Sequence, residues 1–209
     1  MDLIFFGMQG AGKGTVGKAV AAQYNLKIFE TGGALRELAK EDSELGHKIK
    51  TIIESGKLVP NEVVMEIVED FIGKLESGQS VLFDGIPRST EQAESLNMLL
   101  AKNSREYKAV LINITETIAL ERLTTRKICS KCKTVFPAAY EKPTCNQCDG
   151  ELMTRADDNP EAIKTRLEAF HNETEPAINL YNDKMITIDG TTSIEEVTKN
   201  TINTLSTLY

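Results

Sequence analysis

The sequence predicts an α/β protein whose five-stranded parallel sheet is flanked by helices. Short apolar runs alternate with stretches of helical spacing along most of the 209 residues. The first apolar run, residues 3–6, leads through a glycine-rich loop into a helix-compatible segment, residues 16–24. Repeated strand–helix units place the strands in parallel, with helices on both faces of the sheet.

The individual elements follow from periodicity and from glycine and proline signals. Strands are predicted at residues 3–6, 27–30, 81–83, 110–112 and 185–188. Helices are predicted at residues 16–24, 34–41, 43–55, 61–75, 90–102, 115–125 and 160–181, and from Ser193 onward. Residues 126–156 break the alternation, because cysteines, prolines and polar residues replace any long period.

Composition bounds the class of protein. The length fits one domain with small insertions, and a hydrophobic fraction of 41% is enough for a buried core. The net charge of −7 argues against non-specific nucleic-acid binding. We see no signal peptide and no membrane-spanning run, and therefore expect a cytoplasmic protein without a membrane partner. Nothing in the sequence demands more than a monomer.

The loop after the first strand predicts a phosphate site. Its glycines let several backbone N–H groups point at one anion, and the following helix adds the positive end of its dipole. The lysine supplies a mobile charge for the outer phosphates, and the threonine can meet magnesium. The residues concerned are Gly10, Ala11, Gly12, Lys13, Gly14 and Thr15. The alternative is a glycine-rich turn that binds nothing.

Charged residues at segment ends point to phosphoryl transfer, which needs positioning and positive charge more than covalent chemistry. Asp84 ends an apolar strand, where a carboxylate can hold magnesium. Arg122 and Arg126 are four residues apart and are expected on one helix face. Six arginines lie at or near segment ends: Arg36, Arg88, Arg122, Arg126, Arg155 and Arg166. Each taken singly is more often a solvated surface arginine, and only their number beside a phosphate loop favours the functional interpretation.

The four cysteines form two Cys-x-x-Cys pairs, Cys129 with Cys132 and Cys145 with Cys148. Such pairs have the spacing of a tetrahedral structural Zn²⁺ site. A segment of about thirty residues cannot bury much apolar surface, so a metal would replace the missing core. Disulfides or free thiols are the alternative.

Together these motifs resemble the adenylate kinases of bacteria that have a zinc-binding lid, within the P-loop nucleoside monophosphate kinases. The resemblance is carried by the phosphate loop, by Thr31-Gly32 with Leu35-Arg36, by Gly56 to Pro60, by Asp84-Gly85-Ile86-Pro87-Arg88 with Gln92, and by Thr154 to Pro160. The chain departs from the family pattern at Gln9, Gly33 and Ile86.

The resemblance implies three parts: a core of residues 1–29, 60–125 and 157–209, an AMP arm of residues 30–59, and a zinc lid of residues 126–156. It implies magnesium-dependent phosphoryl transfer from ATP to AMP, giving two ADP. The alternatives are a nucleoside monophosphate kinase that acts on UMP or CMP, an enzyme of the adenylate kinase type that prefers GTP as donor, and a non-catalytic nucleotide-binding module.

The resemblance also assigns residues to roles. The ATP site comprises Gly10, Ala11, Gly12, Lys13, Gly14, Thr15, Arg126, Val135, Phe136 and Thr192. The AMP site comprises Thr31, Arg36, Lys57, Val59, Gly85, Arg88, Gln92, Arg155 and Arg166. The catalytic set comprises Lys13, Asp84, Arg88, Arg122, Arg155 and Arg166. Val135 and Phe136 are equally expected as packing residues of the lid.

Overall fold

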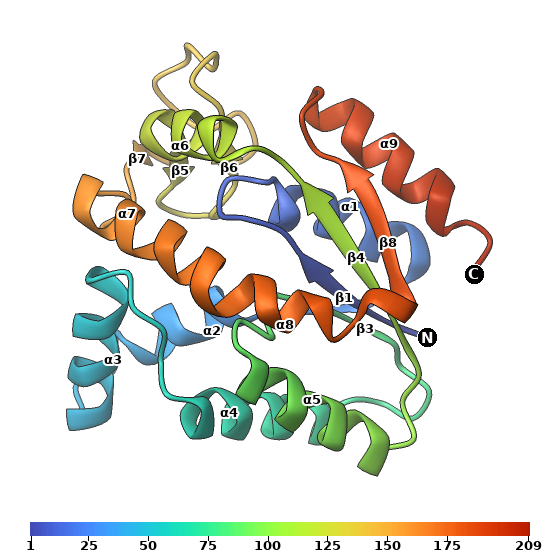
Figure 1. Cartoon of the computed structure of the whole chain (residues 1–209). Helices are drawn as coiled ribbons and strands as arrows, with labels where there is room; N and C mark the ends of the chain where they lie inside the picture. The colour runs from blue at the N-terminus through green and yellow to red at the C-terminus, as the bar shows by residue number, and fades with distance from the viewer.

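The computed structural model describes all residues, 1–209, and confirms the predicted five-stranded parallel sheet (Figure 1). The strand order is β2-β3-β1-β4-β8, and every pairing is parallel. The strands are β1 (Asp2–Phe6), β2 (Lys27–Glu30), β3 (Val81–Asp84), β4 (Tyr107–Asn113) and β8 (Met185–Asp189). β1 and β3 are buried along their whole length, as strands covered on both faces should be.

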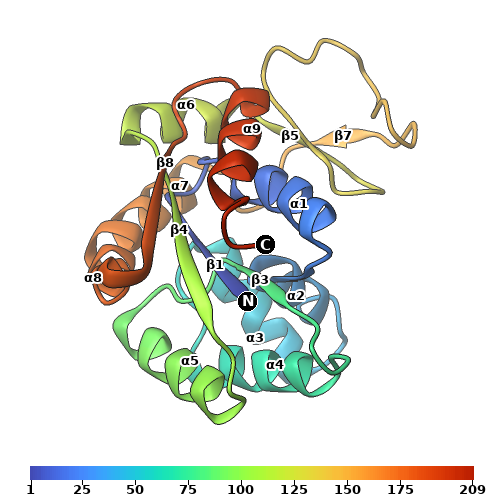
Figure 2. The same ribbon diagram turned by 90° about the vertical axis from the view of Figure 1, so that its right-hand side faces the viewer.

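Helices cover both faces of this sheet (Figure 2). α1 packs against α9 on one face, whereas α5 packs against α4 and α8 on the other. The helices are α1 (Lys13–Tyr24), α2 (Thr31–Leu38), α3 (Glu44–Glu54), α4 (Asn61–Gly73), α5 (Thr90–Lys102), α6 (Glu116–Thr125), α7 (Pro160–Ala169), α8 (Glu175–Asn179) and α9 (Ile194–Leu205). A core of 40 buried residues joins the sheet to these helices.

The topology fixes where a ligand can bind. The chain leaves β1 toward β2 on one side, and leaves β3 toward β4 on the other. The connections therefore diverge at the carboxyl ends of the central strands, which opens a crevice there. The glycine-rich loop follows β1 directly, and Asp84 ends the neighbouring β3, so both reach this crevice.

Two predicted segments differ from the structure. The predicted lid, residues 126–156, contains a small antiparallel sheet of β5 (Lys127–Cys129), β6 (Val135–Phe136) and β7 (Leu152–Met153), whose strands are too short to give a periodic signal. The helix predicted at 160–181 is interrupted by a π-helical turn, η1 (Phe170–Thr174), and ends before a short 3₁₀ turn, η2 (Asn182–Lys184). None of the helices is long and apolar enough to span a membrane.

A buried ion pair ties together the ends of the strands opposite the crevice. Arg105 donates from Nε and Nη2 to both carboxylate oxygens of Asp2, at 2.6 and 2.8 Å. Asp2 Oδ1 also accepts from the backbone N–H of Val81 at 2.8 Å, and Arg105 Nη2 donates to the carbonyl of Gln79 at 2.7 Å. Because the Asp2 side chain is only 3% exposed, its charge depends on this partner.

We expect Arg105→Met to lower the free energy of unfolding by about 3 kcal/mol, because it leaves a buried carboxylate without its cation. Urea unfolding measures the change. The matched control is Lys74→Met, which breaks an exposed ion pair with Asp70 and should cost less than about 1 kcal/mol. Equal effects of the two variants would contradict the interpretation.

Candidate active site

The loop between β1 and α1 has the backbone conformation of a phosphate site. Gly12 is the residue before α1 and adopts a left-handed φ of 88°, a conformation that side chains other than glycine rarely accept. A Cβ on Gly7 would lie 2.5 Å from the carbonyl oxygen of Ile112, so that position also excludes a side chain. Lys13 folds over the loop, and its Nζ donates to the carbonyls of Gly7 and Met8 at 2.6 and 3.1 Å.

This loop opens into a single large cavity of about 1120 Å³. The volume exceeds the range of about 300–1,000 Å³ that is usual for one small ligand, and so suits two. Every residue predicted for the two nucleotide sites lines the cavity except Ala11, which is buried beneath the loop. Residues of the arm and of the lid line it together with residues of the core.

Positive charge is concentrated in this cavity. All six predicted arginines line it, together with Lys13 and Lys57. Burial lowers the pKa of Lys13 to about 8, and Asp84 opposes that change while Arg88 adds to it. Burial and then Arg166 lower the pKa of Arg88, and burial and then Arg126 lower the pKa of Arg155 to about 10. The cationic groups thus repel one another, and an anionic ligand would relieve that repulsion.

Two aspartates at the base of the lid hold two of these arginines. Asp158 accepts from Nε and Nη2 of Arg126 at 2.7 and 2.6 Å, and from Nη1 of Arg166 at 3.0 Å. Asp157 lies 3.3 Å from the same Nη1 of Arg166. Asp158 is buried, and its two partners are mostly buried. Because Arg126 begins the lid and Asp158 follows it, these bonds join the two ends of the lid.

The expectation that Arg122 and Arg126 share a helix face is wrong. α6 ends at Thr125, and Arg126 has an extended backbone that leads into β5. Arg122 instead donates to the carbonyls of Gly10 and Gly190, at 3.3 and 3.0 Å. One arginine therefore lies against the glycine-rich loop, while the other turns toward the base of the lid.

The arm side of the cavity contains a second set of fixed groups. Arg36 donates to Glu30 at 3.0 Å. The Arg88 backbone N–H donates to Oε1 of the buried Gln92 at 2.8 Å, which leaves the Gln92 amide NH₂ free to donate to a ligand. The Arg88 Nε donates to the carbonyl of Gly85 at 2.8 Å. The guanidinium of Arg88 is thus held at the carboxyl end of β3, beside Asp84.

Buried polar atoms without a hydrogen-bond partner also point to a ligand. The side chains concerned are those of Gln9, Thr31, Asn61 and Arg155. All but Asn61 line the cavity. A buried donor or acceptor that is left unpaired costs free energy, so such atoms gather where a ligand supplies the partner. Thr31 Oγ1 and Arg155 Nε belong to the set predicted for AMP.

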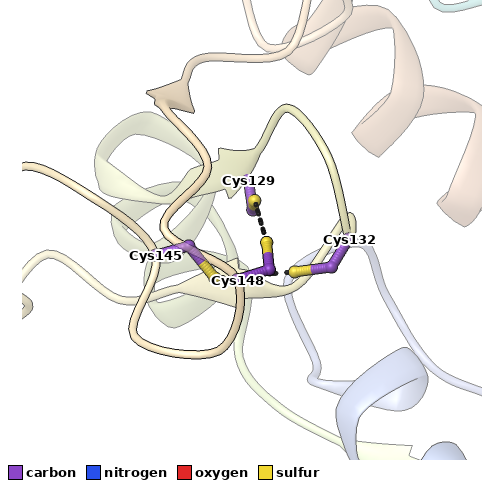
Figure 3. Close-up of side chains that lie close together, drawn as sticks. All are labelled: Cys129, Cys132, Cys145 and Cys148. Atoms are coloured by element: carbon purple, nitrogen blue, oxygen red, sulfur yellow. Dashed lines mark hydrogen bonds between the residues drawn. The ribbon is translucent and has the colours of Figure 1, made fainter.

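The four cysteines converge in the lid (Figure 3). Their Sγ atoms all lie within 4.8 Å of one another, and none forms a disulfide. The pairs Cys129–Cys148 and Cys132–Cys145 are each separated by 3.5 Å. Thiolates at the corners of a zinc tetrahedron with Zn–S bonds of about 2.3 Å are about 3.8 Å apart, so the set fits zinc. Phe136 packs here, with its ring 4.3 Å from that of Tyr140.

The fold and the cavity define a nucleotide-binding phosphotransferase of the phosphate-loop class. Comparison with known proteins identifies the family within this class. The sequence pattern described as Adenylate kinase matches residues 5–186. The chain is 39% identical to an adenylate kinase of Kosmotoga olearia over the full length of both chains, and 38% identical to one of Bacillus pumilus over 94% of both. An adenylate kinase of Alkaliphilus oremlandii is 39% identical over 98% of both chains.

The chain therefore belongs to the adenylate kinase family, and is a phosphotransferase with a phosphate group as acceptor.

Sequence reasoning missed three acidic residues of the site. Asp157 and Asp158 were part of a recognised motif, but their pairing with Arg126 and Arg166 was not predicted. Glu30 reaches Arg36 because Gly32 and Gly33 have no side chains: a Cβ on them would lie 3.0 Å from Arg36 Nη1 and 3.4 Å from Glu30 Oε2. The glycine pair was the available signal for this ion pair.

The low pKa of Lys13 predicts proton uptake when ATP binds. Above about pH 8, a large fraction of Lys13 is neutral in the protein without ATP. The negative charge of bound phosphates raises the pKa of Lys13, so the lysine takes up a proton when ATP binds. Calorimetry at about pH 9, in two buffers of different ionisation enthalpy, measures this uptake. It should vanish near neutral pH and in Lys13→Met; the same uptake in that variant would assign the proton to another group.

Proposed function

We propose that this protein catalyses the reversible, magnesium-dependent transfer of the γ-phosphoryl group of ATP to AMP, giving two ADP. The observation that carries this proposal is the single cavity, which brings the phosphate loop, the arm and the lid together around six arginines. The family match agrees with it. Such a reaction needs in-line positioning and stabilisation of charge on the migrating group, and the cavity offers both.

The donor nucleotide would bind at the loop. The N–H groups of Gly10 to Thr15 and the amino end of α1 would hold its phosphates, with Lys13 at the outer phosphates. Arg122 would lie beside the nucleotide from its place between Gly10 and Gly190, close to Thr192. Val135 is partly exposed at the cavity, whereas Phe136 is mostly buried in the lid, so Val135 is the better placed for contact with the base.

The acceptor nucleotide would bind between the arm and the end of β3. Arg36 and Arg88 would hold its phosphate as planar forks. The free amide NH₂ of Gln92 suits the acceptor nitrogens of adenine, and the Thr31 hydroxyl would gain the partner that it lacks. Lys57, Val59 and Gly85 line the same side of the cavity. Arg155 and Arg166 would surround the phosphates from the base of the lid.

Magnesium fits the oxygen donors at this point. Asp84 ends β3 with a buried carboxylate; burial raises its pKa, and the charge of Lys13 only partly opposes that change. Its Oδ2 lies 3.5 Å from the position of a Cβ on Gly14, directly against the loop. Carboxylate oxygen is a ligand that Mg²⁺ prefers, often through water. Bound there with ATP, the ion would neutralise negative charge on the phosphates.

The chain's moving parts would be the arm, residues 30–59, and the lid, residues 126–156, on a core formed by the rest. Water competes with AMP as the nucleophile, so transfer has to wait until both have closed over the nucleotides. In Figure 2 the lid projects from the body of the molecule on β5 and β7. We also keep a monomeric state and a cytoplasmic location as predictions.

Zinc would hold the lid together. Only Cys129, Phe136 and Cys145 are buried in the lid's own core, which is too few to stabilise a separate unit. Four thiolates around one Zn²⁺ would supply that stability, in a closed site without an open position for catalysis.

An acceptor assay tests the proposed reaction. We expect ADP to form from MgATP with AMP, and not with CMP, UMP or GMP, because Thr31 and Gln92 suit adenine. Lys13→Met should lower kcat about 100-fold or more, because it removes a charge that stabilises the transferring group. The matched control is Lys18→Met, which lines the rim of the cavity on the same helix. Turnover of a pyrimidine monophosphate would overturn the acceptor, and ATP binding without any turnover would overturn the reaction.

Metal removal tests the zinc assignment. We expect about one zinc per chain in the purified protein, and Cys145→Ser should lose it. The lid should then unfold at a lower temperature than the core, which calorimetry resolves as a separate transition. Ser130→Ala is the control, since Ser130 lies in the turn between Cys129 and Cys132 and its substitution removes no thiol. A full zinc content in Cys145→Ser would contradict the four-cysteine site.

A further inference from the structure

The long helix that follows the lid contains an irregular turn at a defined place. α7 and α8 appear as one helix in Figure 1, but residues Phe170–Thr174 between them form a π-helical turn. The N–H of Glu175 donates to the carbonyl of Phe170, five residues earlier. Pro176 explains the wide turn, because it has no N–H for the carbonyl four residues before it and its ring clashes there.

The extra residue of this turn changes which side of the helix faces the active site. Arg166 and Thr174 are eight residues apart, which in a regular helix of 100° per residue would put them about 80° apart around the axis. One extra residue in the turn removes about 100°, and so brings the two side chains to within about 20° of one direction. π-turns inside α-helices occur frequently at functional sites.

Thr174 uses that direction to contact the loop that carries Arg88. Its Oγ1 donates to the backbone carbonyl of Arg88 at 2.9 Å, and the residue is only 7% exposed. The same peptide segment is held on its other side, because the N–H of Arg88 donates to Gln92 Oε1 at 2.8 Å. With the bond from Arg88 Nε to the carbonyl of Gly85, Arg88 is fixed at three points.

Arg88 is a residue whose position is costly to hold. Burial, and then the charge of Arg166, disfavour its charged form. A guanidinium in that situation is drawn toward solvent or toward an anion. A fixed backbone, together with the bond from Arg88 Nε to the carbonyl of Gly85, limits how far it can move. Thr174 is buried, belongs to a different element and is far from Arg88 in the sequence, so it can provide that restraint.

We propose that Thr174 is a positioning residue, which holds Arg88 toward the acceptor phosphate from the π-helical turn. The inference rests on the proposed function, because it takes Arg88 as a ligand of the AMP phosphate. The helix then serves the site twice: Arg166 reaches the cavity directly, and Thr174 acts through the backbone of Arg88.

Thr174→Val tests the proposal, because valine keeps the shape of threonine and removes only the hydroxyl. We expect kcat/KM for AMP to fall about three- to tenfold, the effect of losing one neutral hydrogen bond, and KM for ATP to stay unchanged. The Kd of AMP, measured by calorimetry without turnover, should rise by the same factor. Thr174→Ser should restore both values, since it keeps the hydroxyl.

Two controls separate positioning from a general loss of structure. Thr165→Val removes a hydroxyl of the same helix that also donates to a backbone carbonyl, but on its exposed side, so it should leave the AMP constants unchanged. In an Arg88→Ala background, Thr174→Val should not change the Kd of AMP further. A further rise in that background, or an equal rise in both KM values, would overturn the proposal.

The result is distinct from a failure of the proposed function. If the wild-type protein forms no ADP with AMP, the reaction is wrong. If it does form ADP and Thr174→Val has wild-type kcat/KM and Kd for AMP, only the role of Thr174 is wrong.

Discussion

The structure is organised around a concentration of positive charge that the protein's own carboxylates neutralise only in part. Lys13, Arg88, Arg155 and Arg166 are partly buried around one cavity, and burial together with mutual repulsion lowers the pKa of each. Asp84 opposes part of this for Lys13 and Arg88, and Asp157 and Asp158 for Arg155 and Arg166. The remainder suits the phosphates of two nucleotides. Because cations placed in advance need no rearrangement during reaction, the same arrangement would serve both binding and catalysis in the proposed reaction.

The rest of the chain can be understood as the support for this charge. The core sheet fixes the phosphate loop and Asp84 at neighbouring strand ends, where connections diverge. The bonds between Arg126, Arg166 and Asp158 join both ends of the lid to the helix that follows it. The apolar core of the predicted lid is small, and the proposed zinc bound by its four cysteines would provide the stability that burial provides elsewhere.

Much of the fold and the candidate site could be predicted because the signals are local. The phosphate loop is a contiguous run with a strand before it and a helix after it, and the cysteine pairs have fixed short spacings. The predicted nucleotide-site residues, apart from Ala11, line one cavity. The errors arose where contacts are not local. Arg126 lies outside α6 and forms an ion pair with Asp158, which is distant in the sequence. The π-helical turn between α7 and α8 does not change the spacing of apolar residues enough to be recognised in the sequence.

The sequence by itself determined the class of fold, the phosphate loop, the cysteine set and the family resemblance, because each is written in spacing along the chain. Only the tertiary structure decided which charges pair and which side chains hold others in place. Glu30 with Arg36, Asp158 with two arginines, and Thr174 with the Arg88 carbonyl are examples. The physical reason is that the strength of such a contact depends on the distance between the two groups and on their burial in three dimensions. A sequence pattern shows that several arginines and several carboxylates are present, but not which arginine lies beside which carboxylate.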